Sequence, residues 1–326
     1  MRMVMGKHWN DLDGLRGVLA LAVVFLHFGL SSFLERTLGF PSLRLELVVD
    51  VFFILSGFVL THSLRKGYVF LDFAIKRTMR LLPVYYVTTL VALLFVVEMP
   101  EYVWLELIIA GPLAGRDPVN FPAWSICYEL YLPLIAAALP RLLGEGAVKP
   151  LLLIVLVALG LADVGVAAGE RVYPVRAVLG LLAGHLLYRS QLSVGGRFDY
   201  WGGGVLLLIM LCGAMPELAL AVPFVAAATV VTGVNGGSLF SWSLPQYLGR
   251  ISYTLYLTHV PVLMAMQSVL GSAINQNPGF KLVGILISLA AATLLTWAIE
   301  RPAMRVAPRM IDLSRRWFPI APDAKV

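Results

Sequence analysis

Residues 13–27 read DGLRGVLALAVVFLH, an apolar stretch with Arg16 near its start and His27 at its end. Ionisable side chains are costly to hold inside a membrane, so each is by default a candidate for a functional role. Eleven residues of helix correspond to about three turns and a rise of roughly 16 Å. The stretch therefore predicts a membrane helix with both side chains on one face, Arg16 near the membrane surface and His27 deeper.

Composition extends this prediction to the whole chain. Hydrophobic residues make up 59% of the sequence and charged residues 13%, against about 25% charged in soluble proteins. Apolar runs of about 17–25 residues recur throughout, which predicts an all-α, polytopic membrane helical bundle of about ten transmembrane helices. The expected spans are 14–34, 45–64, 81–97, 122–143, 150–167, 172–188, 202–216, 217–233, 247–270 and 280–299. The apolar segment 102–113 is short for a crossing and is expected to be re-entrant or interfacial.

Basic residues orient the predicted bundle, because cytoplasmic loops concentrate lysine and arginine. With both termini cytoplasmic, most of the 25 basic residues lie inside, including those of the 65–80 loop and of the tail from Arg301. The basic residues left outside are Arg36, Arg44, Arg116, Arg171, Arg176 and Lys281. If 102–113 also crossed the membrane, the numbers of basic residues on the two sides would be nearly equal. Ten crossings therefore fit the charge distribution better.

The remaining sequence leaves no room for a soluble domain, and residues 1–326 are expected to form one integral membrane domain. The first span lacks a clear cleavage site and is expected to be retained. Topology and contact with anionic membrane lipids explain the net charge of +6, so no nucleic-acid partner is expected. Cys127 and Cys212 both lie in apolar runs, which indicates buried thiols and no cysteine-rich metal site.

Four titratable residues are expected in the outer half of the bundle. His27 and Asp50 lie on consecutive spans that form a hairpin, at similar depth. A carboxylate beside an imidazole can orient it as a general base. Glu129, with Ser125 one turn away, is expected at comparable depth, and His259 near the middle of its span.

A second group, of basic residues, is expected at the cytoplasmic face. Arg77 and Arg80 are three residues apart and share a helix face, at the same expected depth as Arg16. Lys76, Arg250 and Arg301 are expected nearby. Guanidinium groups bind phosphate with two donors each, so this group predicts a phosphorylated ligand that approaches from the cytoplasm.

Each residue also has a structural explanation. The arginines could be topology determinants, Asp50 could pair with Arg44 or face water, and His259 could be a packing histidine. The aromatic residues Phe52, Phe53, Trp124 and Tyr256 could belong to the core or the interfacial belt, Ser56-Gly57 could serve close helix packing, and Glu300 and Arg301 could pair at the end of the last helix.

Taken in order, these residues resemble the acyltransferase-3 family of integral membrane acyltransferases, over Leu12 to Arg305. The features that carry the resemblance are Arg16 with His27, the segment 50–58 (DVFFILSGF), the segment 77–83 (RTMRLLP), Trp124-Ser125 with Glu129, the segment 253–259 (YTLYLTH), and Glu300-Arg301-Pro302.

The resemblance implies that an acyl group, most often acetyl, moves from cytoplasmic acyl-CoA to a hydroxyl of a saccharide such as an exopolysaccharide unit. It implies a multi-pass protein of the bacterial plasma (inner) membrane, with acyl-CoA as donor and no metal. Some members of the family carry a hydrolase-like domain after the membrane unit, and a standalone form without it is expected here. The expected catalytic residues are His27, Asp50 and Glu129, those that bind the donor are Arg16, Arg77, Arg80, Ser56 and Arg250, and those that bind the acceptor are Trp124, Ser125, Tyr256 and His259.

The alternative is a proton-coupled small-solute transporter, since buried acids and histidines also build proton pathways. No internal repeat and no matching pair of broken helices is evident in the sequence, which disfavours this alternative.

Overall fold

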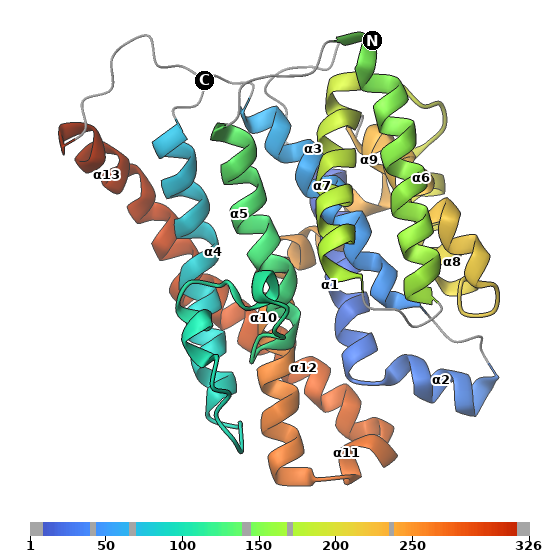
Figure 1. Cartoon of the computed structure of the whole chain (residues 1–326). Coiled ribbons are helices and arrows are strands. Elements are labelled where there is room, and N and C mark those ends of the chain that lie inside the picture. The colour runs from blue at the N-terminus through green and yellow to red at the C-terminus, as the bar shows by residue number, and fades with distance from the viewer. Residues whose placement is uncertain are drawn as a thin grey trace. The chain divides into compact units, whose positions relative to one another are not determined.

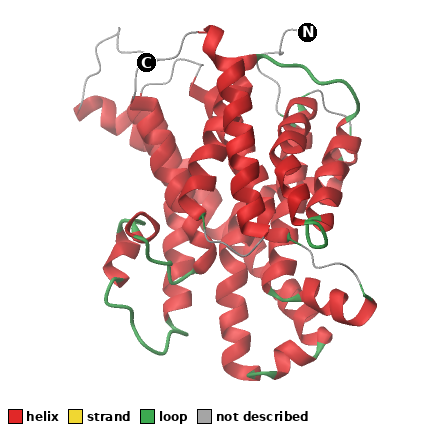
Figure 2. Ribbon diagram, turned by 45° about the vertical axis from the view of Figure 1, so that its right-hand side comes forward, coloured by secondary structure: helices red, strands yellow, loops and turns green. Residues whose placement is uncertain are grey.

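The computed structural model describes residues 9–39, 44–64, 70–138, 145–167, 172–234 and 238–317. Within these ranges the chain is helical and contains no strand (Figure 2), which confirms the all-α fold class. Among the described helical segments, four are long and apolar enough to cross a membrane: Leu45–Leu64, Val148–Ala167, Pro216–Gly233 and Pro278–Trp317. Ten crossings and the cytoplasmic location of both termini stay predictions, and the termini themselves lie outside the described residues.

The α-helices of the described ranges follow one another along the chain as labelled in Figure 1. They are α1 (Asn10–His27), α2 (Leu30–Leu38), α3 (Val48–Leu64), α4 (Phe70–Leu93), α5 (Trp124–Ala138), α6 (Val148–Ala167), α7 (Tyr173–Ser190), α8 (Phe198–Leu211), α9 (Val222–Gly233), α10 (Ser243–Leu270), α11 (Ala273–Gln276), α12 (Pro278–Leu295) and α13 (Arg301–Trp317). A π-helical turn, Thr296–Glu300, joins α12 to α13.

The chain divides into two compact units, each assembled from two separate parts of the sequence. The first unit comprises Met1–Thr61 and Leu143–Tyr253, and the second comprises His62–Leu142 and Thr254–Val326. Two of the three boundaries fall inside α3 and α10, so no loop or linker marks these two in the sequence, and the third, at Leu142, lies outside the described residues.

In the first unit, glycines let α3 and α7 pack with their backbones in contact. A Cβ atom on Gly57 would collide with the carbonyl oxygen of Leu181, and one on Gly184 with that of Ile54. Small residues allow this close approach between membrane helices. The structural explanation of Ser56-Gly57 is therefore confirmed for Gly57.

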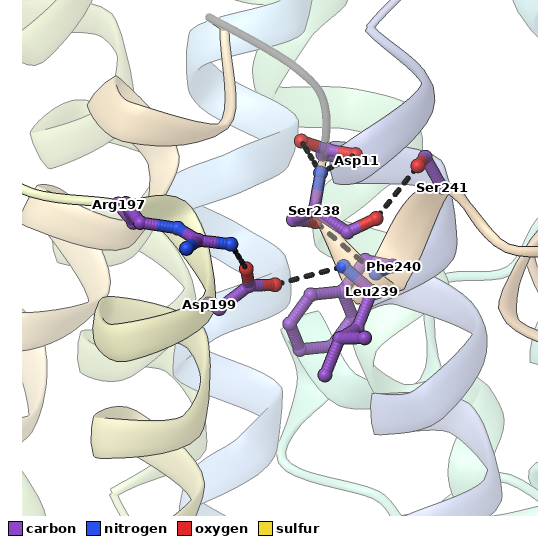
Figure 3. Close-up of polar contacts among 7 residues, drawn as sticks. All are labelled: Asp11, Arg197, Asp199, Ser238, Leu239, Phe240 and Ser241. Carbon is purple, nitrogen blue, oxygen red and sulfur yellow. Dashed lines mark hydrogen bonds and ion pairs between the residues drawn. The ribbon is translucent and has the colours of Figure 1, made fainter.

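The start of α1 is fixed by a turn that precedes α10, drawn in Figure 3. The backbone N–H of Ser238 donates to both carboxylate oxygens of buried Asp11, at 3.4 and 3.3 Å. The N–H of Leu239 donates to Asp199 in α8 at 2.8 Å, and Arg197 donates to the same carboxylate at 3.1 Å. Two acids thus satisfy backbone donors of one turn and hold α1, α8 and the start of α10 together.

Several predicted spans have shifted bounds in the structure, and the shifts of the first and third spans bear on the site. The first was expected to continue to residue 34, but α1 ends at His27, and Gly29 adopts a left-handed conformation (φ 64°) before α2 begins. Glycine tolerates this conformation, which breaks the helix. The third was expected to begin at residue 81, but α4 begins at Phe70, so Arg77 and Arg80 are helical and do not lie in a loop. Residues 65–69 of that expected loop lie outside the described residues.

The apolar segment 102–113 is not a spanning helix, as the charge balance predicted. It forms short 3₁₀ turns at Val103–Leu107 and Gly111–Ala114. In the second unit these turns pack beside α4 and α5: Tyr85 of α4 donates a hydrogen bond of 2.5 Å to Glu106, and the N–H of Val119 donates to the same carboxylate at 2.9 Å.

Candidate active site

Arg16 and Arg250 are carried by helices that touch. A Cβ atom on Gly17 would collide with the backbone nitrogen of Gly249, and one on Gly249 with the carbonyl oxygen of Asp13. Arg16 immediately precedes the first glycine and Arg250 immediately follows the second. Arg16 lies 3.9 Å from the carboxylate of Asp13, and Arg250 is exposed. The first unit therefore brings these two predicted donor-binding arginines to one helix contact.

His27 is the last residue of α1, at the opposite end of the helix from Arg16. Its Nδ1 lies 3.1 Å from the carbonyl oxygen of Val23, one turn earlier. Because a carbonyl only accepts, this hydrogen bond requires a proton on Nδ1. A neutral His27 then carries its lone pair on Nε2, the ring nitrogen that can accept a proton.

The structure corrects the partner predicted for Asp50. Its carboxylate is held by Arg176 of α7, which donates from Nε to both oxygens at 3.0 and 3.1 Å and from Nη2 to Oδ2. Both side chains are buried. Arg176 also donates to the carbonyl oxygen of Glu46 at 2.8 Å. The acid expected to orient His27 is thus part of an ion pair between α3 and α7, whereas the hydrogen bond to Val23 comes from the backbone of α1.

A second buried acid, Asp163 of α6, lies beside this pair. Its carboxylate is 3.7 Å from Nε of Arg176, and neither of its oxygens has a hydrogen-bond partner among the described residues. One guanidinium therefore faces two buried carboxylates. Arg176 and Lys281 were counted among the basic residues on the outer side, but both side chains are buried within helices, so they give no evidence of which loops face the cytoplasm.

The second unit joins residues that the sequence placed at different depths, Glu129 in the outer half of the bundle and Arg77 at the cytoplasmic face. Arg77 of α4 donates through Nε at 2.6 Å, and also through Nη2, to the carbonyl oxygen of Glu129 in α5. The Glu129 carboxylate is 4.0 Å from the same guanidinium. The assignment of Arg77 and Glu129 to separate depths is therefore wrong, because α4 begins eleven residues earlier than expected and α5 packs along it. Arg80 is exposed.

Three of the four predicted acceptor residues lie together in the second unit. The hydroxyl of Ser125 donates to that of Tyr256 at 3.1 Å, and the rings of Tyr256 and His259 are 6.2 Å apart between centroids. His259 is fully buried, with its Nδ1 3.2 Å from the carbonyl oxygen of Leu255. Trp124 precedes Ser125 and packs edge-on to Tyr128, with ring centroids 6.3 Å apart. The result is a buried polar cluster between α5 and α10.

The sequence profile described as an acyltransferase domain matches residues 9–300, a span that contains all of these residues. The chain belongs to the acyltransferase-3 family. No curated protein and no solved structure gives a significant match to the sequence. Family membership and the apolar helices together make this protein a membrane acyltransferase.

Two buried polar residues of this acyltransferase, Asp163 and Asn120, were missed in the sequence, and only the first of them carried a signal. Asp163 is an acid inside an apolar span, the same criterion that singled out His27. Asn120 is fully buried just before α5 and donates to the carbonyl oxygen of Leu257 in α10 at 2.9 Å. It ties together the two helices that hold the polar cluster, but an asparagine in a loop gives no such signal.

The structural alternative in which Glu300 pairs with Arg301 at the end of the last helix is not what the structure shows. Glu300 accepts a hydrogen bond from Thr254 of α10 at 2.7 Å, whereas the Arg301 guanidinium lies 3.5 Å from the centroid of the Trp297 ring. The helix does not end at these residues, because the π turn leads directly into α13. In this acyltransferase, Glu300 fastens the π turn to α10.

Proposed function

We propose that this protein transfers an acyl group, in the first instance acetyl, from cytoplasmic acyl-CoA to a hydroxyl of an exported or cell-surface saccharide at the bacterial plasma membrane. One observation carries the proposal: α1 holds a cationic side chain, Arg16, near its start and an oriented imidazole, His27, at its end. The eleven residues of helix from Arg16 to His27 correspond to a rise of roughly 16 Å. The acyl carrier is anionic at one end and reactive at the other, so an extended donor along α1 would meet both groups.

In this proposal His27 is the general base. Nε2 accepts the proton of the acceptor hydroxyl as its oxygen attacks the thioester carbonyl carbon. The carbon–sulfur bond then breaks, the acyl group stays on the acceptor oxygen, and the proton passes from the imidazolium to the leaving thiolate. The hydrogen bond from Nδ1 to Val23 supports this role because it fixes the required tautomer.

Donor binding is assigned to four arginines that differ in the contacts they already make. Arg16 and Arg250 are the strongest candidates for the phosphates, because the Gly17–Gly249 contact brings their helix segments together. Arg80 is exposed and can bind an anion without breaking a helix contact. Arg77 already donates to Glu129, so a phosphate would have to share it. Ser56 is proposed as a minor donor contact beside the tight Gly57 packing.

The acceptor is assigned to Trp124, Ser125, Tyr256 and His259, with Glu129 beside them. Hydroxyl, phenol and imidazole groups can donate to and accept from a sugar, and the indole ring offers an apolar face to it. The cluster is polar but buried, so its groups can form hydrogen bonds to one hydroxyl-rich sugar unit away from competing water.

The experiment that tests this function uses membranes that contain the full chain, radiolabelled acetyl-CoA and a mixture of saccharide acceptors. We expect CoA thiol release that depends on the acceptor and transfer of label to the saccharide, both lost in His27→Ala and kept in the control His62→Ala. A proton-coupled transporter would instead leave acetyl-CoA intact and move solute in sealed vesicles. That outcome would refute the proposal.

A further inference from the structure

The last helix, α13, packs on α4 with a narrow face. Ala307 and Ile311 are its buried residues, one turn apart, and the helix as a whole lies against α4 (Figure 1). Arg315 adds an ion pair with Asp72 in the first turn of α4. These contacts fix the rotation of α13 about its own axis and so decide which residues it presents outward.

Next to the packed face runs an exposed apolar stripe. Val306, Met310, Leu313 and Trp317 are spaced by four, three and four residues, and so share one side of the helix. They are 41%, 39%, 48% and 79% exposed. Such a continuous stripe of large apolar side chains is unfavourable in water.

Beside the apolar stripe runs a basic one. Arg305, Arg309 and Arg316 are all exposed and recur with the same helical spacing, and Asp312 is the acid among them. An amphipathic helix with an apolar side and a basic side matches the boundary between the acyl chains and the anionic headgroups of a bilayer.

The preceding helix places α13 at this boundary. Pro278–Glu300, which comprises α12 and the π turn, rises roughly 30–35 Å at helical geometry. A bilayer core is about 30 Å thick, so this segment by itself is long enough to cross it. The chain then changes from apolar to basic at Arg301, as a helix does where it leaves the core.

We propose that α13 lies along the cytoplasmic surface of the membrane and binds the headgroups of anionic phospholipids. The arginine guanidinium groups bind headgroup phosphates with two donors each, and the apolar stripe inserts among the acyl chains. Both stripes take part, so an intact anionic lipid binds, whereas a soluble phosphate does not substitute for it. This binding surface is separate from the proposed catalytic groups and does not depend on the acyl transfer.

The test measures the thermal unfolding midpoint of the purified full-length protein in neutral detergent. Phosphatidylglycerol is expected to raise the midpoint by several degrees more than phosphatidylcholine, and glycerol phosphate is expected to have no effect. Arg305→Gln/Arg309→Gln should lose this difference, as should Met310→Ser/Leu313→Ser. The control Arg36→Gln/Lys149→Gln removes two basic residues from elsewhere in the chain and should keep it.

Equal shifts with both lipids in the wild type, or an unchanged difference in Arg305→Gln/Arg309→Gln, would overturn the proposal. So would a concentration-dependent dimer that the same substitutions dissociate, since the surface would then belong to a second copy. If the variants fail to fold, native mass spectrometry of the wild type replaces them. Retained phosphatidylglycerol must then fall as salt rises, and retention that is insensitive to salt contradicts binding through arginine.

Discussion

At the scale of single residues, the most consequential group is the buried set of Arg176, Asp50 and Asp163. Breaking a buried ion pair from one side leaves an uncompensated charge, which typically costs about 3–5 kcal/mol. We expect Arg176→Ala to lose about this much, because it leaves two buried carboxylates without their cation. Thermal unfolding in detergent measures the loss, and a melting temperature equal to that of the wild type would contradict the ion-pair assignment.

The two acids of this group should behave differently. Asp50 accepts hydrogen bonds from Arg176, whereas the oxygens of Asp163 accept none from described residues. Asp50→Asn should therefore lower stability and yield while the transfer rate per folded molecule is preserved. Asp163→Asn should cost little or stabilise, because it removes an excess negative charge. Equal destabilisation by both substitutions, in the same unfolding assay, would show that Arg176 binds the two acids alike.

The arginines divide by the contacts they make. Arg16→Ala and Arg250→Ala should each weaken acyl-CoA binding by about 1.5–3 kcal/mol, the range for hydrogen bonds to charged groups. Lysine should not restore the affinity fully, because it lacks the planar guanidinium. Arg77→Ala should mainly lower stability, since its guanidinium binds the backbone of α5. Titration calorimetry with CoA checks these expectations, and unchanged affinity in Arg16→Ala and Arg250→Ala would place the donor elsewhere.

At the scale of helices, the glycine contacts are the sensitive points. Gly57→Leu should separate α3 from α7 and also strain the Asp50–Arg176 pair that joins them, so the folded protein should be strongly reduced. Gly203→Ala in α8 is the matched control, because no atom lies within 4 Å of its Cβ position. The control should be neutral or gain up to about 1 kcal/mol from helix propensity. Size-exclusion yield and thermal unfolding distinguish the two, and a well-folded Gly57→Leu would refute the tight contact.

At the scale of the whole molecule, the sequence predicted the features that depend on composition and on the length and order of its apolar and polar segments. Apolar runs of about 20 residues are sufficient to predict an all-α membrane protein, and the order of short motifs was sufficient for the family. The non-spanning nature of 102–113 also followed, from charge balance. These features depend on short segments or on sums over the whole sequence, and so do not require knowledge of how the helices pack.

Features that depend on helix rotation and on exact boundaries were not predictable. Consecutive spans that form a hairpin place His27 and Asp50 at similar depth, but only helix packing decides that Asp50 faces Arg176. The third span was predicted from its apolar run and so begins after Arg80, although the polar first turns of α4 are helical too. This error separated Arg77 from Glu129, which are hydrogen-bonded in the structure. The division into two compact units was not predicted, because two of its three boundaries lie inside helices, where no loop or linker marks them.

The central claim is that α1 binds acyl-CoA through Arg16 and uses His27 as the base that activates the acceptor. The most direct test measures transfer rate and CoA affinity together for wild type, His27→Ala and Arg16→Ala. We predict that His27→Ala lowers the rate by about 10²–10⁴-fold with CoA affinity unchanged, and that Arg16→Ala weakens affinity. Near wild-type transfer by folded His27→Ala would contradict the account.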